Sequence, residues 1–131
     1  MFKMKKKFSK SWVKSKNVRK QRNYRKNAPL HIKRKFVRSC LSKELRKKYG
    51  IKTIGLRKND KVKIMRGQFR KKSGTISRID LKKGKIYIEG ISQIKRDGTK
   101  AQYPLDASNL MVMELETGDK ERKKILERKQ K

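Results

Sequence analysis

The residues best placed to hold a ligand form a short basic loop between two glycines, MRGQFRKKSG at residues 65–74. Glycine lets one backbone approach another closely, and the N–H groups around it can meet phosphate oxygens. Arginine makes bidentate contacts to phosphate, and an aromatic ring can stack on a base. In an alternative reading, the loop is a solvated hairpin with incidental charge and Phe69 packs against the core. The loop residues that we expect to contact a nucleic acid are Arg66, Gly67, Phe69, Arg70, Lys71, Lys72 and Gly74.

A second basic segment, NVRKQRNYRKNAPLHIKRK at residues 17–35, mixes its cations with Asn, Gln, Tyr and His. Planar polar groups among cations suit irregularly folded RNA, where hydrogen bonds to sugars and stacking supplement phosphate pairing. A generic basic tail on a DNA-packaging protein is the alternative. From this segment and the basic face that follows it, we expect RNA contacts from Arg19, Lys20, Arg22, Tyr24, Arg25, Lys26, Asn27, His31, Lys33, Arg34, Lys35, Arg38, Arg46 and Lys47. A later turn adds Lys95 and Arg96 to this RNA-binding set.

The sequence offers little for catalysis or metal binding. Cys40 and His31 are the only residues of their types, so neither an intramolecular disulfide nor a zinc-knuckle spacing is available. Asp60 and Asp97 stand at turns, where aspartate typically binds backbone N–H groups. A Gly-Lys-Ser/Thr phosphate loop is also missing from the sequence. We therefore expect no enzymatic activity, no metal and no cofactor, and we expect Cys40 to pack as a small buried or half-buried apolar residue.

The charge balance predicts a polyanionic partner. The 131 residues hold 43 Lys and Arg against 11 Asp and Glu, a net charge of +32. A compact domain with this charge repels itself unless a polyanion neutralises it. A membrane is the weaker candidate, because the chain has no run of about 18 apolar residues. The N-terminus also lacks the apolar core of a signal peptide and the glycine of a myristoylation motif. We expect a soluble, cytoplasmic protein that binds nucleic acid.

We expect the chain to consist of four segments, and two of them precede the strands. Residues 1–28 form a basic RNA-binding arm, which we expect to be disordered or extended until a partner neutralises it. Residues 29–50 are expected to form short basic amphipathic helices, because apolar residues recur every four positions from Val37 to Tyr49. Pro29 can start this helical region, Ser42 can start a second helix after a kink, and Gly50 can end it in a left-handed conformation.

Residues 51–114 have the pattern of short strands separated by Gly- and Asp-containing turns. Ile76 and Ile79 cannot share one face of a regular strand, so we expect a bulge or a strong bend there. Such strands predict a small closed barrel, and the fold class is mainly β with α extensions. Residues 115–131 are expected to form a short solvated helix capped by Thr117 or Asp119. The alternating apolar positions are Val62 and Ile64, Ile86 and Ile88, and Leu110 and Val112.

The stretch from Asn59 to Gly90, NDKVKIMRGQFRKKSGTISRIDLKKGKIYIEG, resembles a KOW motif. Upstream lie RKQRNYRKNAPLHIKRK and LSKELRKKYG, and downstream lies EGISQIKRDGTKAQYPLDASNLMV. Together these blocks resemble the family of universal large-subunit ribosomal protein twenty-four in its eukaryotic and archaeal form, which eukaryotic naming calls protein twenty-six. A KOW-containing transcription factor of the NusG type is a rival, but it needs an αβ domain before the motif, for which this chain has no room.

The resemblance implies an SH3-like barrel whose basic extensions bury themselves in large-subunit rRNA near the exit of the nascent-peptide tunnel. It also implies a role in subunit assembly and translation, neighbouring large-subunit proteins as partners, no homo-oligomer, and nucleolar assembly if the source is eukaryotic. By position, Gly74 matches the family's signature glycine and Arg66-Gly67 its RNA-facing loop. The family commonly has a glycine where Lys71 stands, and a positive backbone angle there would cost lysine about 1 kcal/mol. The N-terminal RNA-contacting block is matched by Arg19, Lys20, Arg22, Asn27, Pro29, Leu30 and His31.

Overall fold

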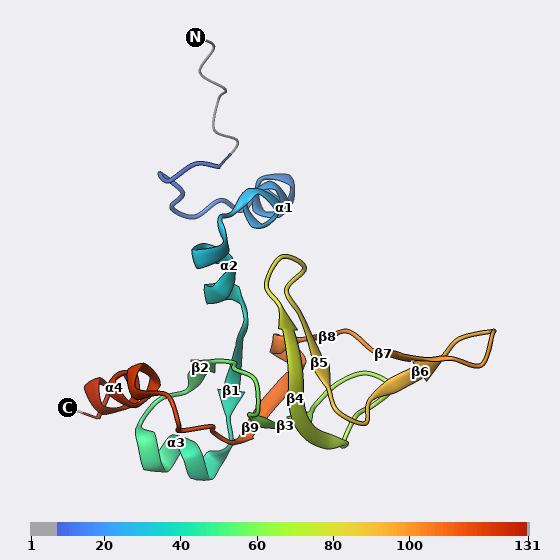
Figure 1. Ribbon diagram of the computed structural model, residues 1–131. Coiled ribbons are helices and arrows are strands. Elements are labelled where there is room, and N and C mark those ends of the chain that lie inside the picture. The colour runs from blue at the N-terminus through green and yellow to red at the C-terminus, as the bar shows by residue number, and fades with distance from the viewer. Residues whose placement is uncertain (1–7, 131) are drawn as a thin grey trace.

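The computed structural model describes residues 8–130 and consists of a bent β-sheet with helices near both ends of the chain (Figure 1). Residues 1–7 of the expected basic arm lie outside the described residues. The helices are α1 (Val18–Asn27), α2 (Leu30–Phe36), α3 (Lys43–Tyr49), the 3-10 helix η1 (Ala107–Asn109) and α4 (Lys120–Arg128). The strands are β1 (Arg38–Leu41), β2 (Thr53–Gly55), β3 (Lys61–Ile64), β4 (Ser73–Asp80), β5 (Lys85–Ile88), β6 (Ser92–Ile94), β7 (Lys100–Gln102), β8 (Leu105–Asp106) and β9 (Leu110–Glu114).

Seven strands form one sheet in the order β2-β1-β9-β3-β4-β5-β8, and β6 and β7 form a separate hairpin that projects from it (Figure 1). Only β1 and β9 pair in parallel among these strands. The fold is mainly β with helical extensions, as predicted. Within the described residues no pairing joins the edge strands β2 and β8, so the sheet is barrel-like rather than a ring closed by hydrogen bonds. A register shift between Ile76 and Arg78 confirms the predicted bulge.

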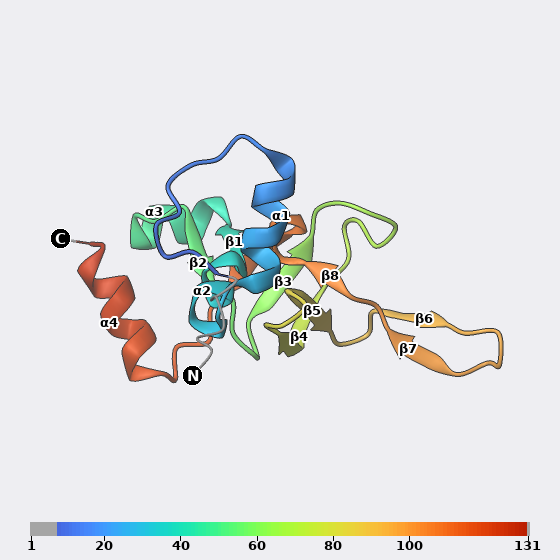
Figure 2. The same cartoon turned by 90° about the horizontal axis from the view of Figure 1, so that it is seen from above.

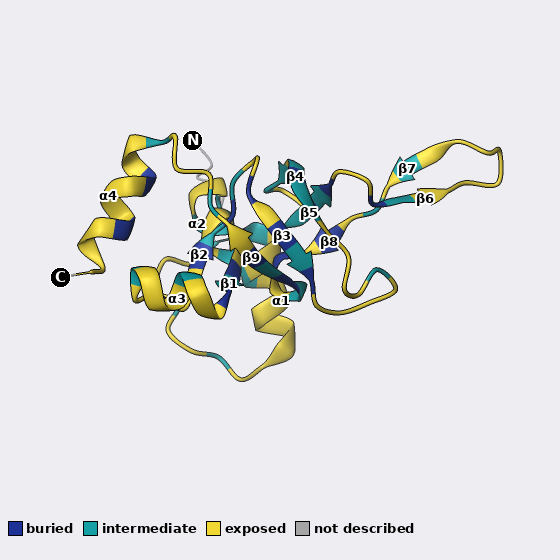
Figure 3. Ribbon diagram, turned by 90° about the horizontal axis from the view of Figure 1, so that it is seen from below, coloured by how far each residue is buried: buried dark blue, intermediate teal, exposed yellow. Residues whose placement is uncertain are grey.

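The core lies where the strand pattern predicts it. The alternating residues of β3, β5 and β9 are fully buried, together with Ile76 on β4. Figure 3 shows that burial is concentrated on the strands, whereas α1 and α3 are largely exposed. Each large apolar side chain buried in this way stabilises the fold by about 1.5–3 kcal/mol. The fully buried apolar residues are Leu41, Val62, Ile64, Ile76, Ile86, Ile88, Leu110 and Val112.

Gly74 is required by close packing between β4 and β5. A Cβ atom built on it would lie 2.6 Å from Cγ2 of Ile88 and 3.0 Å from the carbonyl oxygen of Glu89. The first of these distances is shorter than real Cβ contacts, so a larger residue would force the two strands apart. The glycine expected to bind RNA is therefore also a packing residue, paired with Val62 inside the sheet.

The predicted helix over residues 29–50 is wrong for residues 38–41, which form strand β1. Cys40 and Leu41 pair in parallel with Met111 and Val112 of β9. Apolar side chains do recur every four residues here, but the series runs from the end of α2 into a strand. Hydrogen bonding in the sheet outweighs the weak helix preference of these residues. Two boundaries are confirmed: the hydroxyl of Ser42 accepts a hydrogen bond from the Leu45 N–H, and Gly50 has φ 66° at the end of α3.

The expectation of disorder or extension for the arm is wrong for residues 18–27, which form α1. The side chain of Asn17 caps this helix by accepting a hydrogen bond from the Arg19 N–H at 3.0 Å. No residue of α1 is buried. Tertiary support comes from aromatic stacking, since the ring of Tyr24 lies 4.6 Å from that of Trp12 and 6.1 Å from that of Phe36.

The C-terminal helix is docked on the sheet rather than fully solvated. Asp119 caps α4 as predicted, with its carboxylate accepting from the Glu121 N–H at 3.0 Å. One face of the helix is nevertheless buried, at Arg122 and Leu126, which are 2% and 5% exposed.

Arg122 is held by Asp60, whose side chain is fully buried. The two terminal guanidinium nitrogens of Arg122 donate to the two carboxylate oxygens of Asp60 at 2.6 and 2.7 Å. The same carboxylate accepts from the backbone N–H groups of Arg57 at 3.0 Å and Glu116 at 2.9 Å. Asp60 thus has the predicted role of binding backbone N–H groups at a turn, and it also anchors α4, which the sequence pattern did not indicate.

Candidate nucleic-acid interface

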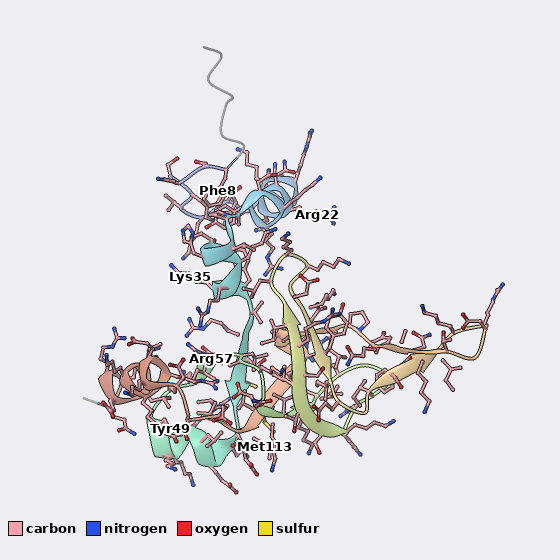
Figure 4. The ribbon with its side chains drawn as sticks, in the orientation of Figure 1. Phe8, Arg22, Lys35, Tyr49, Arg57 and Met113 are labelled. Carbon is pink, nitrogen blue, oxygen red and sulfur yellow. The ribbon has the colours of Figure 1, made fainter. Side chains whose placement is uncertain are left out.

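The expected RNA-binding residues of the arm lie on the surface of α1. Figure 4 shows Phe8 and Arg22 at the end of the molecule that the arm forms, opposite the end that carries Tyr49 and Met113. Asn27, at the last position of the helix, is half-buried. The arm therefore presents its cations along an already formed helix. The exposed basic residues of α1 are Arg19, Lys20, Arg22, Arg25 and Lys26.

Tyr24 has a different position from the cations beside it. Its ring is at the centre of an aromatic cluster and contacts the rings of Phe8, Trp12 and Phe36 at centroid distances of 5.1, 4.6 and 6.1 Å. Next to the cluster, the guanidinium of Arg25 lies 5.3 Å from the centroid of Phe36, which is a cation–π geometry. Tyr24 therefore holds Phe8 and Trp12 against α1 and α2, and its half-buried ring is engaged within the protein.

Four of the expected residues meet in one groove. His31, Arg34 and Lys35 of α2 and Arg38 of β1 line a surface groove, to which β2 contributes Ile54 and α4 contributes further residues. Burial and the nearby positive charges of Arg34 and Arg122 lower the pKa of Arg57, which also lines this groove, while the charge of Asp60 raises it. The groove concentrates positive charge over an aliphatic surface.

Three other expected residues face different parts of the molecule. Lys33 turns away from the groove, and its ammonium donates to the carbonyl oxygen of Lys82 at 3.3 Å. Arg46 of α3 donates from Nε to the carbonyl of Leu41 at 2.9 Å, and Lys47 is exposed on the same helix. Because α3 lies far from α1 (Figure 1), Arg46 and Lys47 are not brought together with the arm.

The basic loop joins β3 to β4, and its cations point to solvent. The backbone of Lys71 has φ 73°, and its N–H donates to the Ile64 carbonyl at 2.9 Å. The position that commonly holds glycine in the resembling family therefore does need a positive angle, and lysine adopts it here. Gly67 has φ 97°, which glycine adopts without steric cost. The exposed residues of the loop are Arg66, Gly67, Arg70, Lys71 and Lys72.

Phe69 takes the alternative arrangement, in which it packs against the core. Its ring meets that of Tyr103 edge to face at 4.9 Å, and the Lys72 ammonium lies 5.2 Å from its centroid. This contact ties the basic loop to the residues that follow β7. Phe69 therefore shapes the loop, and the charges around it remain free to meet a ligand.

Lys95 and Arg96 lie at the exposed tip of the β6–β7 hairpin, which projects away from α1 (Figure 1). The neighbouring Asp97 carboxylate accepts hydrogen bonds from the side chain and the backbone of Thr99, at 2.7 and 3.0 Å, and these bonds lower the pKa of Asp97. Asp97 thus shapes the turn, as its position in the sequence predicts. The two basic residues form a contact point separate from the arm.

Across residues 8–130, none of the expected RNA-binding residues forms an ion pair. The five ion pairs of this part of the chain lie on the sheet and around α4. In Figure 2, α4 and the β3–β4 loop lie on opposite sides of the molecule, and in Figure 1 this loop lies well below α1. The arm and the loop are thus two separate groups of cations that the described residues leave without a paired carboxylate. The ion pairs are Arg57–Asp119, Lys61–Glu114, Lys85–Asp106, Arg122–Asp60 and Lys124–Glu121.

Other kinds of site are not built by the described residues. These residues contain no group of three or more His, Cys, Asp and Glu side chains placed to hold a metal ion. Among their helices, none combines the length and the apolar character needed to cross a membrane. Cys40 is half-buried, with its sulfur 3.7 Å from the Leu110 carbonyl, which confirms its predicted role as a small packing residue.

Comparison with known proteins shows to which family of nucleic-acid-binding proteins the chain belongs. A family model that describes the eukaryotic ribosomal proteins L26 and their archaeal counterparts matches residues 15–129. The chain belongs to this family. One curated relative, the large ribosomal subunit protein uL24 of Korarchaeum cryptofilum (strain OPF8), is 43% identical over 117 residues, which is 89% of each chain. Membership of the ribosomal L26 family makes the chain a structural, non-enzymatic constituent of the large ribosomal subunit and confirms the resemblance drawn from its motifs.

Proposed function

We propose that the chain binds and stabilises large-subunit rRNA through the cations of α1 and α2 and the loop between β3 and β4. The observation that carries this proposal is the exposed, uncompensated charge of these segments. All five cations of α1 and the four of the loop are exposed, and none is paired with a carboxylate in residues 8–130. A structured RNA offers the density of phosphate that this surface needs.

In this mechanism the sheet is a rigid body and the arm is the element that enters the RNA. Each phosphate neutralised by a Lys or Arg releases condensed counterions, so the logarithm of affinity falls by roughly 0.7–0.9 per tenfold rise in salt for each contact. Because α1 is already helical and is held by the Tyr24 cluster, binding orders fewer residues than a disordered arm would. Preorganisation of this kind raises affinity without adding contacts.

The proposal extends to a position near the exit of the nascent-peptide tunnel and to a role in assembling the subunit. Membership of the ribosomal L26 family and the order of the three sequence blocks support both points. Neighbouring large-subunit proteins would then be the protein partners. Depletion of the chain is expected to reduce large subunits relative to small subunits on a sucrose gradient.

Crosslinking by ultraviolet light in cells tests the RNA contacts directly. Sequencing of the attached RNA should give a few sites in large-subunit rRNA around the tunnel exit. Mass spectrometry of the attached peptides should map them to residues 18–38 and 66–72. Crosslinks spread over messenger RNA or chromatin, or confined to α4, would contradict the proposal.

A matched pair of variants adds a quantitative control to the crosslinking. Arg19→Gln with Arg22→Gln removes two exposed cations from α1, and Lys120→Gln with Lys123→Gln removes two from α4. Crosslinking yield per molecule should fall in the first variant and remain close to the original in the second. Equal losses would mean that net charge, rather than the arm, determines RNA binding.

A further inference from the structure

We infer that the cleft between the arm and the turn joining β4 to β5 is a phosphate-binding subsite, which takes a phosphodiester of the bound RNA and fixes the arm to the sheet. This inference rests on the proposed function. It adds Lys82 and Lys83, at the β4–β5 turn, which the motifs of the sequence did not single out as RNA-binding. It also assigns a shared ligand to Arg25 and Lys33, which come from two different helices.

The lining of the cleft is strongly basic. Arg25 from α1, Lys33 from α2, and Lys82 and Lys83 from the turn contribute to its walls. A fifth cation, Lys85, also lines it, but its ammonium pairs with the carboxylate of Asp106 at 2.6 Å. Asp106 is the only acidic residue of the lining, so the other four cations face the cleft without a carboxylate partner among the described residues.

The cleft is preformed by contacts within the protein. The Lys33 ammonium donates to the carbonyl oxygen of Lys82 at 3.3 Å, which joins α2 to the β4–β5 turn across 49 residues of sequence. The backbone N–H of Lys83 donates to the carboxylate of Asp80 at 3.2 Å, which shapes the turn. Gly84 completes it with φ 67°. In Figure 1 the turn reaches up beside α2, below α1, and residues of all three elements line the cleft.

Phosphate is the ligand class that this arrangement suits best. Four like charges gathered in one cleft repel each other, and an anion with several acceptor oxygens removes this repulsion while accepting from more than one cation. The guanidinium of Arg25 is partly held in place by its contact with the ring of Phe36, which also lines the cleft. The RNA backbone is the natural source because α1, one wall of the cleft, belongs to the proposed RNA-binding arm.

A bound phosphodiester has a structural consequence beyond affinity. It would add a link among three elements. At present Tyr24 and Arg25 of α1 contact Phe36 of α2, and Lys33 of α2 is hydrogen-bonded to Lys82 of the turn. The arm would then be locked in one direction relative to the sheet. The subsite thus acts as a clamp that couples RNA binding to arm orientation.

The test uses the full chain with Lys82→Gln and Lys83→Gln together, and Lys120→Gln with Lys123→Gln as a control of equal charge. Both pairs are exposed, and the turn contacts of Lys82 and Lys83 are made by backbone atoms, so the fold is retained. The probe is a fluorescein-labelled RNA hairpin of about 30 nucleotides, titrated by anisotropy from 50 to 400 mM KCl. Affinity near 150 mM KCl should fall about tenfold in the turn variant and less than about threefold in the control, and the salt slope should fall by roughly 1.5 in the turn variant only.

Amide NMR supplies a second measurement. The pattern of amide chemical-shift changes does not follow from a general loss of positive charge. In the original chain, RNA should shift the amides of Arg25, Lys33 and Gly84 together, and in the turn variant the Arg25 and Gly84 shifts should disappear. Sodium phosphate as the only ligand separates the sources. If it saturates the same shifts at low millimolar concentration and the RNA hairpin does not, the cleft is a site for a free anion and the inference is wrong.

The outcomes also separate this inference from the proposed function. If both variants bind the hairpin as tightly as the original chain and with the same slope, the clamp is refuted while RNA binding by the arm stands. If the original chain itself shows no salt-dependent binding to the hairpin or to large-subunit rRNA, the proposed function fails first.

Discussion

Replacing Arg122 by methionine tests how the C-terminal helix is held on the sheet. Arg122 is 2% exposed, and its two terminal nitrogens account for two of the four hydrogen bonds that the buried Asp60 carboxylate accepts. Methionine keeps most of the volume of the side chain and removes the charge. The carboxylate of Asp60 is then left buried with only the backbone N–H groups of Arg57 and Glu116.

The magnitude follows from breaking one half of a buried ion pair. Removing a single partner of such a pair costs about 3–5 kcal/mol, because the other charge remains without compensation. For a chain of this length that corresponds to a fall in Tm of about 12–20 °C. Asp60→Asn should cost a similar amount. The double variant should cost less than the sum of the two, with a coupling free energy of about 2 kcal/mol.

Urea denaturation followed by circular dichroism measures these free energies of unfolding without the ionic screening of guanidinium. Lys124→Met on the same helix is the matched control, because Lys124 pairs with Glu121 at 3.2 Å but both side chains are mostly exposed. It should change the free energy of unfolding by at most about 0.5 kcal/mol. If Arg122→Met costs no more than Lys124→Met, or if the coupling free energy is zero, the Asp60–Arg122 pair does not anchor α4 and the reasoning fails.

The backbone and one turn give three further predictions. Gly74→Ala should lower the free energy of unfolding in urea by about 1–3 kcal/mol, because the added methyl clashes across β4 and β5, whereas Gly55→Ala, with open space around it, should have a much smaller effect. Lys71→Gly should raise the Tm by a few degrees, because the positive φ at this position costs lysine about 1 kcal/mol; an unchanged or lower Tm would mean that the angle is not strained. The pKa of Asp97 is lowered by its bonds to Thr99, so the turn that it stabilises should persist above the ordinary aspartate pKa and loosen as the pH falls through the lowered value. Carboxyl NMR titration should show this low pKa, and Thr99→Ala should raise it towards the ordinary value, whereas an unmoved pKa would exclude the hydrogen bonds as its cause.

Local chemistry alone was enough to place several features of this protein. Alternation of apolar residues located the cores of β3, β5 and β9, because a strand buried on one face repeats every two residues. The spacing of Ile76 and Ile79 located the bulge in β4. Ser42, Gly50 and Asp119 marked helix ends correctly, because capping depends on one side chain or one backbone angle and its nearest neighbours. The three motif blocks identified the family, and the uneven charge predicted a polyanionic partner.

Tertiary contacts decided the rest. Residues 38–41 carry a helical spacing but form β1, since their partner in β9 lies about 70 residues away and supplies hydrogen bonds that a local pattern does not contain. Arg122 gave no sign of burial, because an arginine in a charged helix is ordinarily solvated and only the distant Asp60 makes its burial favourable. The cleft that joins Arg25, Lys33 and the β4–β5 turn exists only when the chain is folded. What the sequence determined depended on neighbours within a few residues, and what it left open depended on pairing between residues that folding alone brings together.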